Sequence, residues 1–483
     1  MRHRLHLLFA LVLMHFAPSP ASGDIASKDW TFFVYMNADN NLEPDAIYNI
    51  NQMEQVGSTS SVNIVVQIRR SPKYDFSNGN WIGTRRLYIT KDDDPLTISS
   101  QPLPWPCAPL GCQPTLETDD DLGDVSVYKQ SIDWLVATYP AKRYAIVFWG
   151  HGRGWRTQPR PELFRGLEPG ERSGKRITTR QLGDALVYTA EKIGHPVDLV
   201  IFDSCNMQMM EVAAELKRSA EIMVGSEDIV PPDGIPYDVI LRGLTDDSNI
   251  AAVDFGRDIV AAYQRHYTTI SSTLSLLRLA ELPELLNRLD TLGRLLLKND
   301  QRHEHLRSAY NDSVKFHFAD FVDMGLFVAL LQRADPTAYE KATIDLRTAL
   351  DRLVQVSKTT GPELQSATGL SMYFPQPHMF DRDYASLEIV AGAPSWLKVL
   401  NDYSDPKNRD IVAELRRNAL STPEMLKVSP ERLEFETRVL VNQLKALKAS
   451  RPSDAELNER LTRLRSDFAI RQSVSKELRD ALQ

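Results

Sequence analysis

Two residues suited to nucleophilic chemistry each follow a short apolar run. Cys205 ends the stretch Asp198-Leu-Val-Ile-Phe-Asp-Ser-Cys205, and His151 follows the apolar run 144–149. Short, continuous apolar runs of this kind predict strands that are buried on both faces. A thiol becomes an effective nucleophile when a nearby imidazole takes its proton. Because parallel strands present their carboxyl ends at one edge of a sheet, we expect His151 and Cys205 to lie together, although 54 positions (205 minus 151) separate them.

The elements that must position this pair alternate between strands and helices. Aromatic and β-branched runs predict strands, and apolar residues at three- and four-residue spacing predict helices. The predicted strands are 30–36, 62–68, 144–149, 198–203 and 221–226, and the helices between them are 44–56, 126–139, 178–193 and 208–219. This order predicts an α/β fold with a mostly parallel sheet covered by helices on both faces. The helix 208–219 would also bring its positive amino-terminal end near Cys205 and lower the pKa of the thiol.

Length and composition suggest how the chain is divided. The protein has 483 residues, 42% hydrophobic and 25% charged, which is typical of a globular chain. We expect a folded unit over 24–395, with the core sheet within about 28–245 and a mainly helical second part over 246–395. Within that second part, 273–279 could form a strand and 369–375 a short late strand. Residues 396–483 change to charged amphipathic helices and form a separate extension.

The first residues point to export. Arg2 and Arg4 precede an apolar run over 5–16 and a small-residue stretch over 18–23, the pattern of a secretory signal peptide over 1–23. A buried N-terminal helix is the alternative interpretation. No later segment has the roughly 20 apolar residues that a membrane span needs, so we expect a periplasmic or secreted protein with no membrane contact after signal removal.

The net charge and the cysteine positions indicate which binding partners and which cysteine states to expect. The net charge is −8, and loss of the two arginines of the signal brings it to about −10, which gives no electrostatic basis for binding nucleic acid. Cys107 and Cys112 lie in a proline-rich loop and are candidates for a disulfide in an oxidising compartment. That pairing leaves Cys205 as either a buried inert thiol or a reactive one.

No cofactor is required by the sequence. The acidic cluster at Asp119–Asp121 and Asp124 could bind calcium through oxygen ligands, but it lacks the spacing of a calcium loop, and a solvated turn is the simpler interpretation. There is no Cys/His spacing of a zinc site. The glycines around His151 do not form a phosphate-binding loop.

Three stretches resemble one known family. Trp149-Gly-His-Gly-Arg-Gly-Trp155, Phe202-Asp-Ser-Cys-Asn-Met207 and the 226–237 loop resemble the clostripain family of cysteine peptidases, whose catalytic domain has a caspase-like fold, and the resemblance extends over roughly 28–380. It implies that Cys205 is the nucleophile of a thioester acyl-enzyme and that His151 is the general base and acid. It also implies that the backbone N–H of Gly152, together with that of Cys205, forms the oxyanion hole.

The resemblance also implies a substrate class. Asp233 matches an acidic position that family members use to bind basic side chains, and Asp203 matches a second acidic position at the same pocket. We therefore expect an endopeptidase that cleaves proteins or peptides after Arg, with Lys second. The alternatives are an ordinary Asp-Gly turn for Asp233 and a helix cap for Asp203.

Other implied properties concern regulation. Family enzymes cut themselves between the histidine and the cysteine, and the basic 153–177 loop offers Arg165, Arg172 and Arg176 as self-cleavage candidates; a surface loop that is never cut is the alternative. The resemblance allows calcium dependence without identifying ligands. Two other functions use the same residues: a transpeptidase or ligase, and a caspase-like binding module whose catalysis is weak or lost. The oligomeric state is left open.

Overall fold

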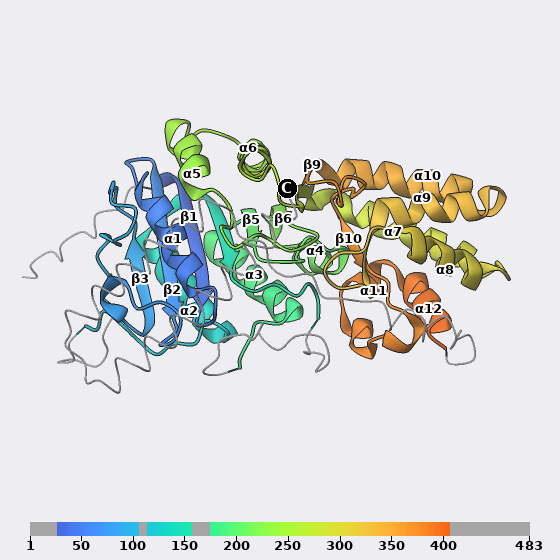
Figure 1. Cartoon of the computed structure of the whole chain (residues 1–483), viewed down its shortest axis with the longest axis horizontal. Coiled ribbons are helices and arrows are strands. Elements are labelled where there is room, and N and C mark those ends of the chain that lie inside the picture. Colours follow the sequence, from blue (N-terminus) through green and yellow to red (C-terminus); the bar gives the residue numbers. More distant parts are fainter. Residues whose placement is uncertain (1–26, 106–113, 157–173, 406–483) are drawn as a thin grey trace, which may run out of the picture.

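A computed structural model describes residues 27–105, 114–156 and 174–405. Its centre is an eight-stranded sheet in the order β3-β2-β1-β4-β5-β6-β7-β9 (Figure 1). The strands are β1 Lys28–Ala38, β2 Val62–Arg70, β3 Gly83–Tyr88, β4 Ala141–Trp149, β5 Val197–Asp203, β6 Ala220–Gly225, β7 Ser272–Arg278 and β9 Val354–Thr360. Strands β2, β1, β4, β5 and β6 are parallel, and β3, β7 and β9 add antiparallel edges. The predicted α/β fold with a mostly parallel sheet is confirmed.

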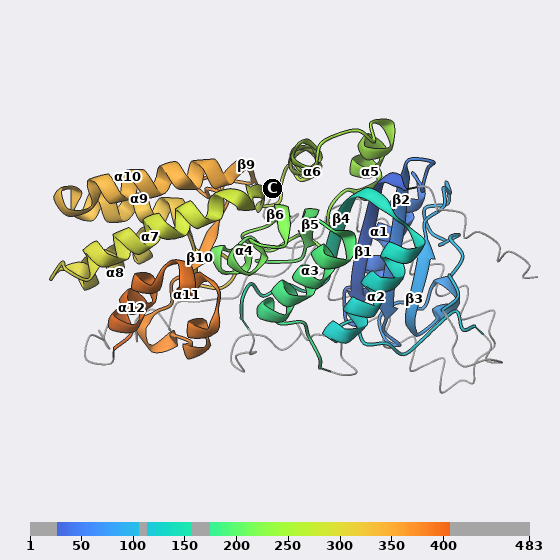
Figure 2. The same cartoon turned by 180° about the vertical axis from the view of Figure 1, so that it is seen from behind.

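Helices cover both faces of the sheet because alternate strand residues are apolar on both sides. Phe33 and Ile146 belong to the core under α2, α3 and α4, whereas Phe32 and Val147 belong to the core under α1, α5 and α6. Figures 1 and 2 show these two layers from opposite sides. The helices are α1 Glu43–Glu54, α2 Val125–Thr138, α3 Thr179–Ile193, α4 Met210–Leu216, α5 Tyr237–Asp246 and α6 Ala252–His266.

The second part of the chain is helical but is continuous with the sheet. It contains α7 Leu282–Leu296, α8 Arg302–Asp312, α9 Met324–Ala334, α10 Pro336–Leu353, α11 Ile389–Gly392 and α12 Pro394–Tyr403, with a small ribbon of β8 Phe321–Asp323 and β10 Ser371–Tyr373. Its short 3-10 turns are η2 Leu279–Glu281, η3 Pro377–Met379 and η4 Arg382–Ser386, whereas η1 Asn78–Asn80 lies between β2 and β3. Strands β7 and β9 also come from this part. The core sheet therefore extends beyond residue 245, where we expected it to end.

The boundary expected between 395 and 396 falls inside α12. Trp396, Val399 and Leu400 of this helix are each at most 1% exposed and pack in the same core as α7. The folded unit thus continues through Tyr403. The predicted signal peptide, the rest of the C-terminal extension, Cys107 and Cys112 lie outside the described residues.

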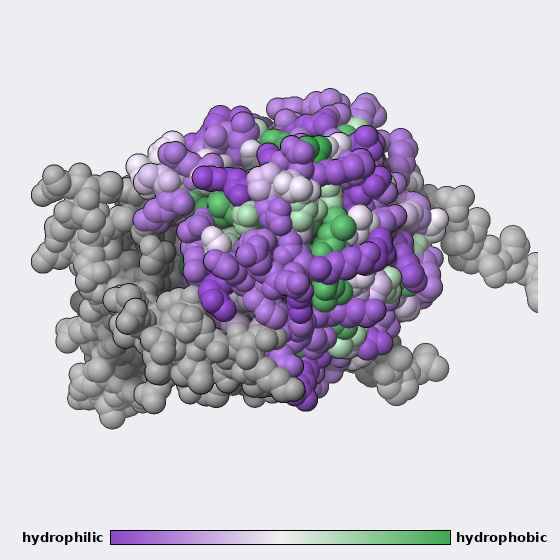
Figure 3. All heavy atoms as spheres, turned by 90° about the vertical axis from the view of Figure 1, so that its right-hand side faces the viewer, coloured by the Kyte–Doolittle hydropathy of each residue, from purple (hydrophilic) through white to green (hydrophobic). Residues whose placement is uncertain are grey.

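The surface of the helical end is mainly hydrophilic, with small separate hydrophobic areas on the face seen in Figure 3. Across the described ranges, none of the helices has both the length and the apolar composition needed to cross a bilayer.

Candidate active site

His151 and Cys205 follow neighbouring strands at the same edge of the sheet. Strands β4 and β5 are parallel, with Trp149 paired to Asp203, so that each residue of the pair lies two positions beyond a matched strand end. Two bonds extend this pairing: the Gly150 N–H donates to the Asp203 carbonyl at 3.2 Å, and the Ser204 hydroxyl donates to the Phe148 carbonyl at 3.1 Å. The structure therefore brings together the two loops that the sequence predicted to meet.

Gly152 allows these loops to touch. A Cβ atom at this position would lie 2.1 Å from the Cys205 carbonyl oxygen and 2.7 Å from the Cys205 nitrogen. No side chain fits at such distances, because real Cβ atoms do not approach backbone atoms closer than about 3 Å. The requirement for glycine is thus a close backbone approach beside the nucleophile.

The imidazole of His151 is held by Asn41, a residue that the sequence analysis did not select. Its Nε2 atom lies 2.8 Å from the Asn41 amide oxygen. An amide oxygen only accepts hydrogen bonds, so Nε2 carries the proton and Nδ1 is left as the basic nitrogen. Asn41 follows β1, which is the other neighbour of β4, in the run Asn37-Ala-Asp-Asn-Asn41.

Cys205 is half-buried, and its sulfur accepts a hydrogen bond from the Val230 N–H at 3.4 Å. Burial, with smaller contributions from the nearby Asp228 and Asp203 carboxylates, raises the pKa of the Cys205 thiol to about 12, while the hydrogen bond from Val230 opposes this shift. Burial, with a contribution from Arg153, lowers the pKa of His151 to about 4. At neutral pH, the two groups are therefore a neutral thiol and a neutral imidazole.

This differs from the thiolate that the sequence analysis expected. The predicted helix 208–219 is shorter in the structure, where α4 begins at Met210 and has seven residues. Its amino terminus is five positions beyond Cys205. The residue after Cys205, Asn206, has a left-handed backbone (φ 60°) and redirects the chain. The helix dipole therefore does not act directly on the sulfur, because its effect falls off within the first turn.

The Asp203 carboxylate lies against Gly234, the residue after Asp233, on the face of the sheet covered by α1 and α5. The Asp203 carboxylate, in a side chain that is 5% exposed, accepts hydrogen bonds from the Ile235 N–H at 3.2 Å and the Tyr237 hydroxyl at 2.8 Å. A Cβ on Gly234 would lie 2.7 Å from an Asp203 oxygen. Burial raises the pKa of Asp203 to about 6, although both hydrogen bonds act in the opposite direction.

Asp233 is 1% exposed and lies 3.8 Å from the imidazole Nε2 of His266. Its backbone is fixed by Asn49, whose amide donates to the Asp233 carbonyl at 2.9 Å and whose oxygen accepts from the Trp149 indole at 2.8 Å. The loop that carries Asp233 is thus tied to β4, the strand that leads to His151. We call the group Asp203, Asp233 and Gly234 the acidic pocket.

Of the three self-cleavage candidates, Arg176 lies within the described residues, while Arg165 and Arg172 lie outside them. The Arg176 side chain is half-buried and lines a cavity next to His151, on the α3 face of the sheet. It does not reach the acidic pocket, which lies on the opposite face.

The carboxylates of the acidic cluster after β3 bond to groups of the chain itself. Asp119 pairs with Arg69 at 3.2 Å, an Asp121 oxygen accepts from the Gly123 N–H, and Asp124 caps α2 by accepting from the Ser126 N–H. In the described part of the chain, no group of three or more His, Cys, Asp or Glu side chains is arranged to hold a metal ion.

Comparison with known proteins agrees with this geometry. A model of the clostripain family matches residues 34–403. Clostripain from Hathewaya histolytica is 27% identical over 223 residues, which cover 44% of this chain and 41% of that relative's length.

Two solved structures share the fold over most of the chain. A secreted C11 cysteine protease from Bacteroides thetaiotaomicron, in complex with an irreversible peptide inhibitor, superposes with a TM-score of 0.57 and 20% identity, covering 77% of this chain and 100% of that one. An inactive zymogen C11 protease from Parabacteroides distasonis superposes with a TM-score of 0.56 and 18% identity, covering 76% of this chain and 99% of that one. With the family model spanning both catalytic loops and α12, the chain belongs to the clostripain family of cysteine peptidases.

Proposed function

We propose that the protein is an exported endopeptidase that cuts after Arg, and less readily after Lys, with Cys205 as nucleophile and His151 as general base. One observation carries the proposal: His151 and Cys205 follow paired ends of β4 and β5, and the buried carboxylates of Asp203 and Asp233 lie at the same edge.

The neutral pair defines the order of proton transfer. As the Cys205 sulfur attacks the scissile carbonyl, its proton moves to Nδ1 of His151, and the new C–S bond replaces the C–N bond. The same proton then goes to the departing amine. Water hydrolyses the thioester, with His151 again accepting a proton, so that the thiol is regenerated. Asn41 keeps Nε2 protonated throughout and is a positioning residue for the imidazole.

The oxyanion would be bound by the backbone N–H groups of Gly152 and Cys205. The close approach of Gly152 to the Cys205 backbone supports this assignment. Each such donor contributes about 10²–10³ to the rate in comparable enzymes.

Selectivity for Arg follows from the acidic pocket. A guanidinium forms two parallel hydrogen bonds to carboxylate oxygens, which an ammonium cannot do. Because the pocket is buried, an uncharged side chain would leave at least one carboxylate without a cationic partner.

Self-cleavage is part of this proposal. The segment between β4 and α3 carries basic residues and separates the histidine from the cysteine in the sequence, and one of the structural relatives is described as an inactive zymogen. Export is supported by the N-terminal sequence and by the description of another relative as secreted.

The test is active-site labelling of the mature protein with an Arg chloromethylketone, together with turnover of an Arg-aminomethylcoumarin peptide. We expect label on Cys205 and turnover in the wild type, and neither in Cys205→Ala. Turnover that survives this substitution would remove Cys205 from the mechanism. A folded wild type with neither label nor turnover would instead identify a binding module.

A further inference from the structure

The loop after His151 is packed against the part of the chain that follows β5. Gly152 lies against the Cys205 backbone, and a Cβ on Gly154 would lie 3.0 Å from the Phe321 ring. Gly154 also has a left-handed backbone (φ 61°), which a residue with a side chain rarely adopts. The path of the loop is therefore set by residues that come much later in the sequence.

Trp155 anchors this loop in an aromatic cluster, and its side chain is 1% exposed. Its ring makes edge contacts with Tyr373 of β10 at a centroid distance of 4.9 Å and with Tyr384 of η4 at 5.4 Å. Both tyrosines are fixed by Glu211 of α4, whose carboxylate accepts from the Tyr373 N–H at 3.0 Å and from the Tyr384 hydroxyl at 2.9 Å. Because α4 follows the Cys205 loop, the cluster joins the two loops at a second place.

Arg156 forms an ion pair with Asp320, which lies in the turn between α8 and β8. The two side chains are only 10% and 7% exposed. The guanidinium also lies over the rings of Phe318 and Phe321, 5.2 Å from each centroid. A buried charge is costly once its partner is removed, so the pair and the two rings hold Arg156 in one place.

The turn of residues 316–321 that carries Asp320 also contacts the loop of the nucleophile. The His317 N–H donates to the Asp228 carboxylate at 2.8 Å. The Asp228 carbonyl accepts from the N–H of Asn206, the residue after Cys205, at 2.9 Å. One turn of the helical second part therefore contacts the loop of the imidazole on one side and, through Asp228, the loop of the thiol on the other.

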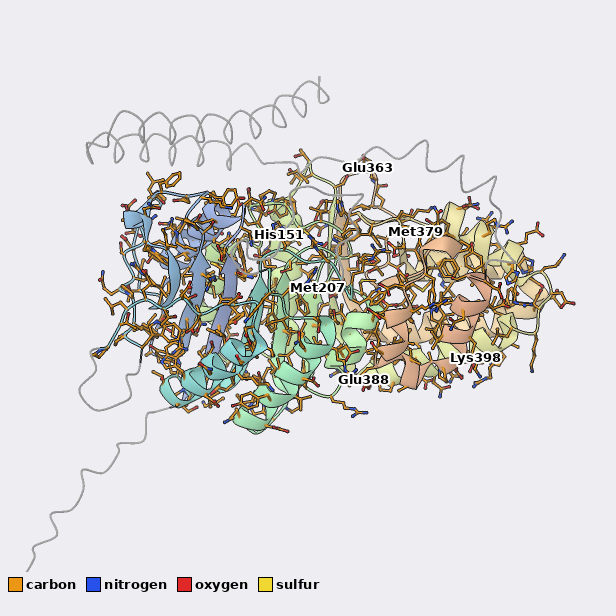
Figure 4. The ribbon with its side chains drawn as sticks, turned by 90° about the horizontal axis from the view of Figure 1, so that it is seen from below. His151, Met207, Glu363, Met379, Glu388 and Lys398 are labelled. Carbon is orange, nitrogen blue, oxygen red and sulfur yellow. The ribbon has the colours of Figure 1, made fainter. Side chains whose placement is uncertain are left out.

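We propose that Arg156 and Asp320 are positioning residues that hold the His151 imidazole beside the Cys205 sulfur. The inference rests on the proposed peptidase function, in which His151 takes the thiol proton. Asn41 orients the ring from the β1 side, and the ion pair fixes the far end of the loop. In Figure 4, His151 lies between β1 and the helices of the second part, the two regions that supply these anchors. A loop fixed at both ends keeps the imidazole within reach of the proton that it must accept.

The first experiment separates positioning from substrate binding, because Arg156 also lines the cavity beside His151. With an Arg-aminomethylcoumarin peptide we expect kcat to fall about tenfold in Arg156→Gln and in Asp320→Asn, while KM stays within about twofold of the wild type. Arg156→Lys keeps the charge and should keep part of the activity. Because the pair acts as a unit, the double variant Arg156→Gln/Asp320→Asn should be no slower than the slower single variant.

Alkylation of Cys205 by iodoacetamide gives a second readout, which needs no peptide binding. The C–S bond forms, iodide leaves and the thiol proton goes to His151, so that His151→Ala sets the lower limit of the rate. We expect Arg156→Gln to lie close to this limit, with the modified cysteine identified by peptide mapping. If His151→Ala is alkylated as fast as the wild type, the imidazole does not serve the sulfur and the proposal is wrong. A wild type that shows His151-dependent alkylation and cuts no peptide would overturn the proposed function, and the alkylation rates would then decide the positioning role.

Arg302→Gln is the matched control. Arg302 of α8 pairs with Asp402 of α12 at 2.7 Å, which is another Arg–Asp pair between distant segments of the second part. Its loss should lower the Tm and leave kcat and the alkylation rate unchanged. The proposal fails if Arg156→Gln shows the same pattern, or if it raises KM at unchanged kcat, which would assign Arg156 to substrate binding. Intact mass and circular dichroism ensure that folded variants are compared in the same processing state.

Discussion

The polar groups on the two sides of His151 and Cys205 differ in how they are hydrogen-bonded. In the acidic pocket, Asp203 is bonded by Ile235 and Tyr237, and the Asp233 backbone is bonded by Asn49. In the cavity beyond His151, the polar atoms of Tyr35 and Arg176 have no partner among the described residues. A carboxylate that is already fixed by hydrogen bonds from the protein can bind a cationic side chain with little rearrangement. This favours strict selection of positively charged substrate side chains.

The largest expected effect is at Gly152, where the two sides meet. Gly152→Ala would place a methyl group against the Cys205 backbone and displace the oxyanion donors. We expect kcat/KM for Arg-aminomethylcoumarin to fall by about 10²–10³. A loss of this kind affects every substrate alike, whichever residue follows the cut.

The matched control for this substitution is Gly243→Ala. Gly243 lies in α5 and has no atom within 4 Å of a Cβ position, so the same added methyl group should leave turnover unchanged. Full activity in Gly152→Ala would show that the contact with Cys205 has no catalytic importance.

Next in size is the effect of Asp233→Asn on selectivity. The change removes one carboxylate of the acidic pocket, and we expect kcat/KM for an Arg peptide to fall about 100-fold while the isosteric citrulline peptide changes little. Asp238→Asn makes the same charge change on the first turn of α5 and serves as the control. An equal loss for both peptides in Asp233→Asn would contradict the pocket assignment.

A smaller effect is expected at Asn41. Asn41→Ala removes the acceptor for Nε2 of His151 and should lower kcat about 5- to 30-fold, the cost of a buried donor left unpaired. Asn41→Asp keeps an acceptor, adds a charge that favours the imidazolium, and should restore turnover while moving the acidic limb of the pH profile upward. Asn40→Ala is the control, because the Asn40 side chain bonds to the backbone of its own turn, and it should leave the pH profile unchanged. If Asn41→Asp behaves like Asn41→Ala, the amide acts as a donor.

The pH dependence should separate the acidic pocket from the dyad. The pKa of Asp203 is raised to about 6, so the pocket loses a negative charge as the pH falls through 6. We expect kcat/KM for Arg peptides to rise by about tenfold as the pH increases through this value. The citrulline peptide should show only the limb near pH 4 that is set by His151. Asp203→Asn should remove the step at pH 6, and its persistence there would assign it to another group.

The loops that carry His151 and Cys205 could be predicted because each follows a continuous apolar run at the end of its strand. Strands β4 and β5 are buried on both faces, and this composition identified their ends as well as their parallel pairing. Asn41 was missed because the run after β1 is rich in Asn and Asp, which is equally typical of an ordinary turn. The signal was present: β1 also neighbours β4, so its end had to lie at the same edge.

Strand β9, the outermost strand on one side of the sheet, could not be predicted in the same way. Strand β9 follows α10 directly, has the sequence Val-Gln-Val-Ser-Lys-Thr-Thr, and is only partly buried over most of its length. A half-polar strand that continues from a helix without a break has no clear period. The protonation states of Cys205 and His151 could not be predicted from the sequence either. They depend on burial and on carboxylates such as Asp228 that the fold brings near the sulfur.

The order of the strands has one more consequence. Everything before the segment that joins β4 to α3 contributes β3, β2, β1 and β4, and everything after it contributes β5, β6, β7 and β9. A cut in that segment would therefore divide the polypeptide into two fragments, each with four neighbouring strands of the sheet. The two fragments would stay joined by the backbone hydrogen bonds between β4 and β5. His151 would belong to one fragment and Cys205 to the other. The proposed dyad would then exist only while β4 and β5 remain paired.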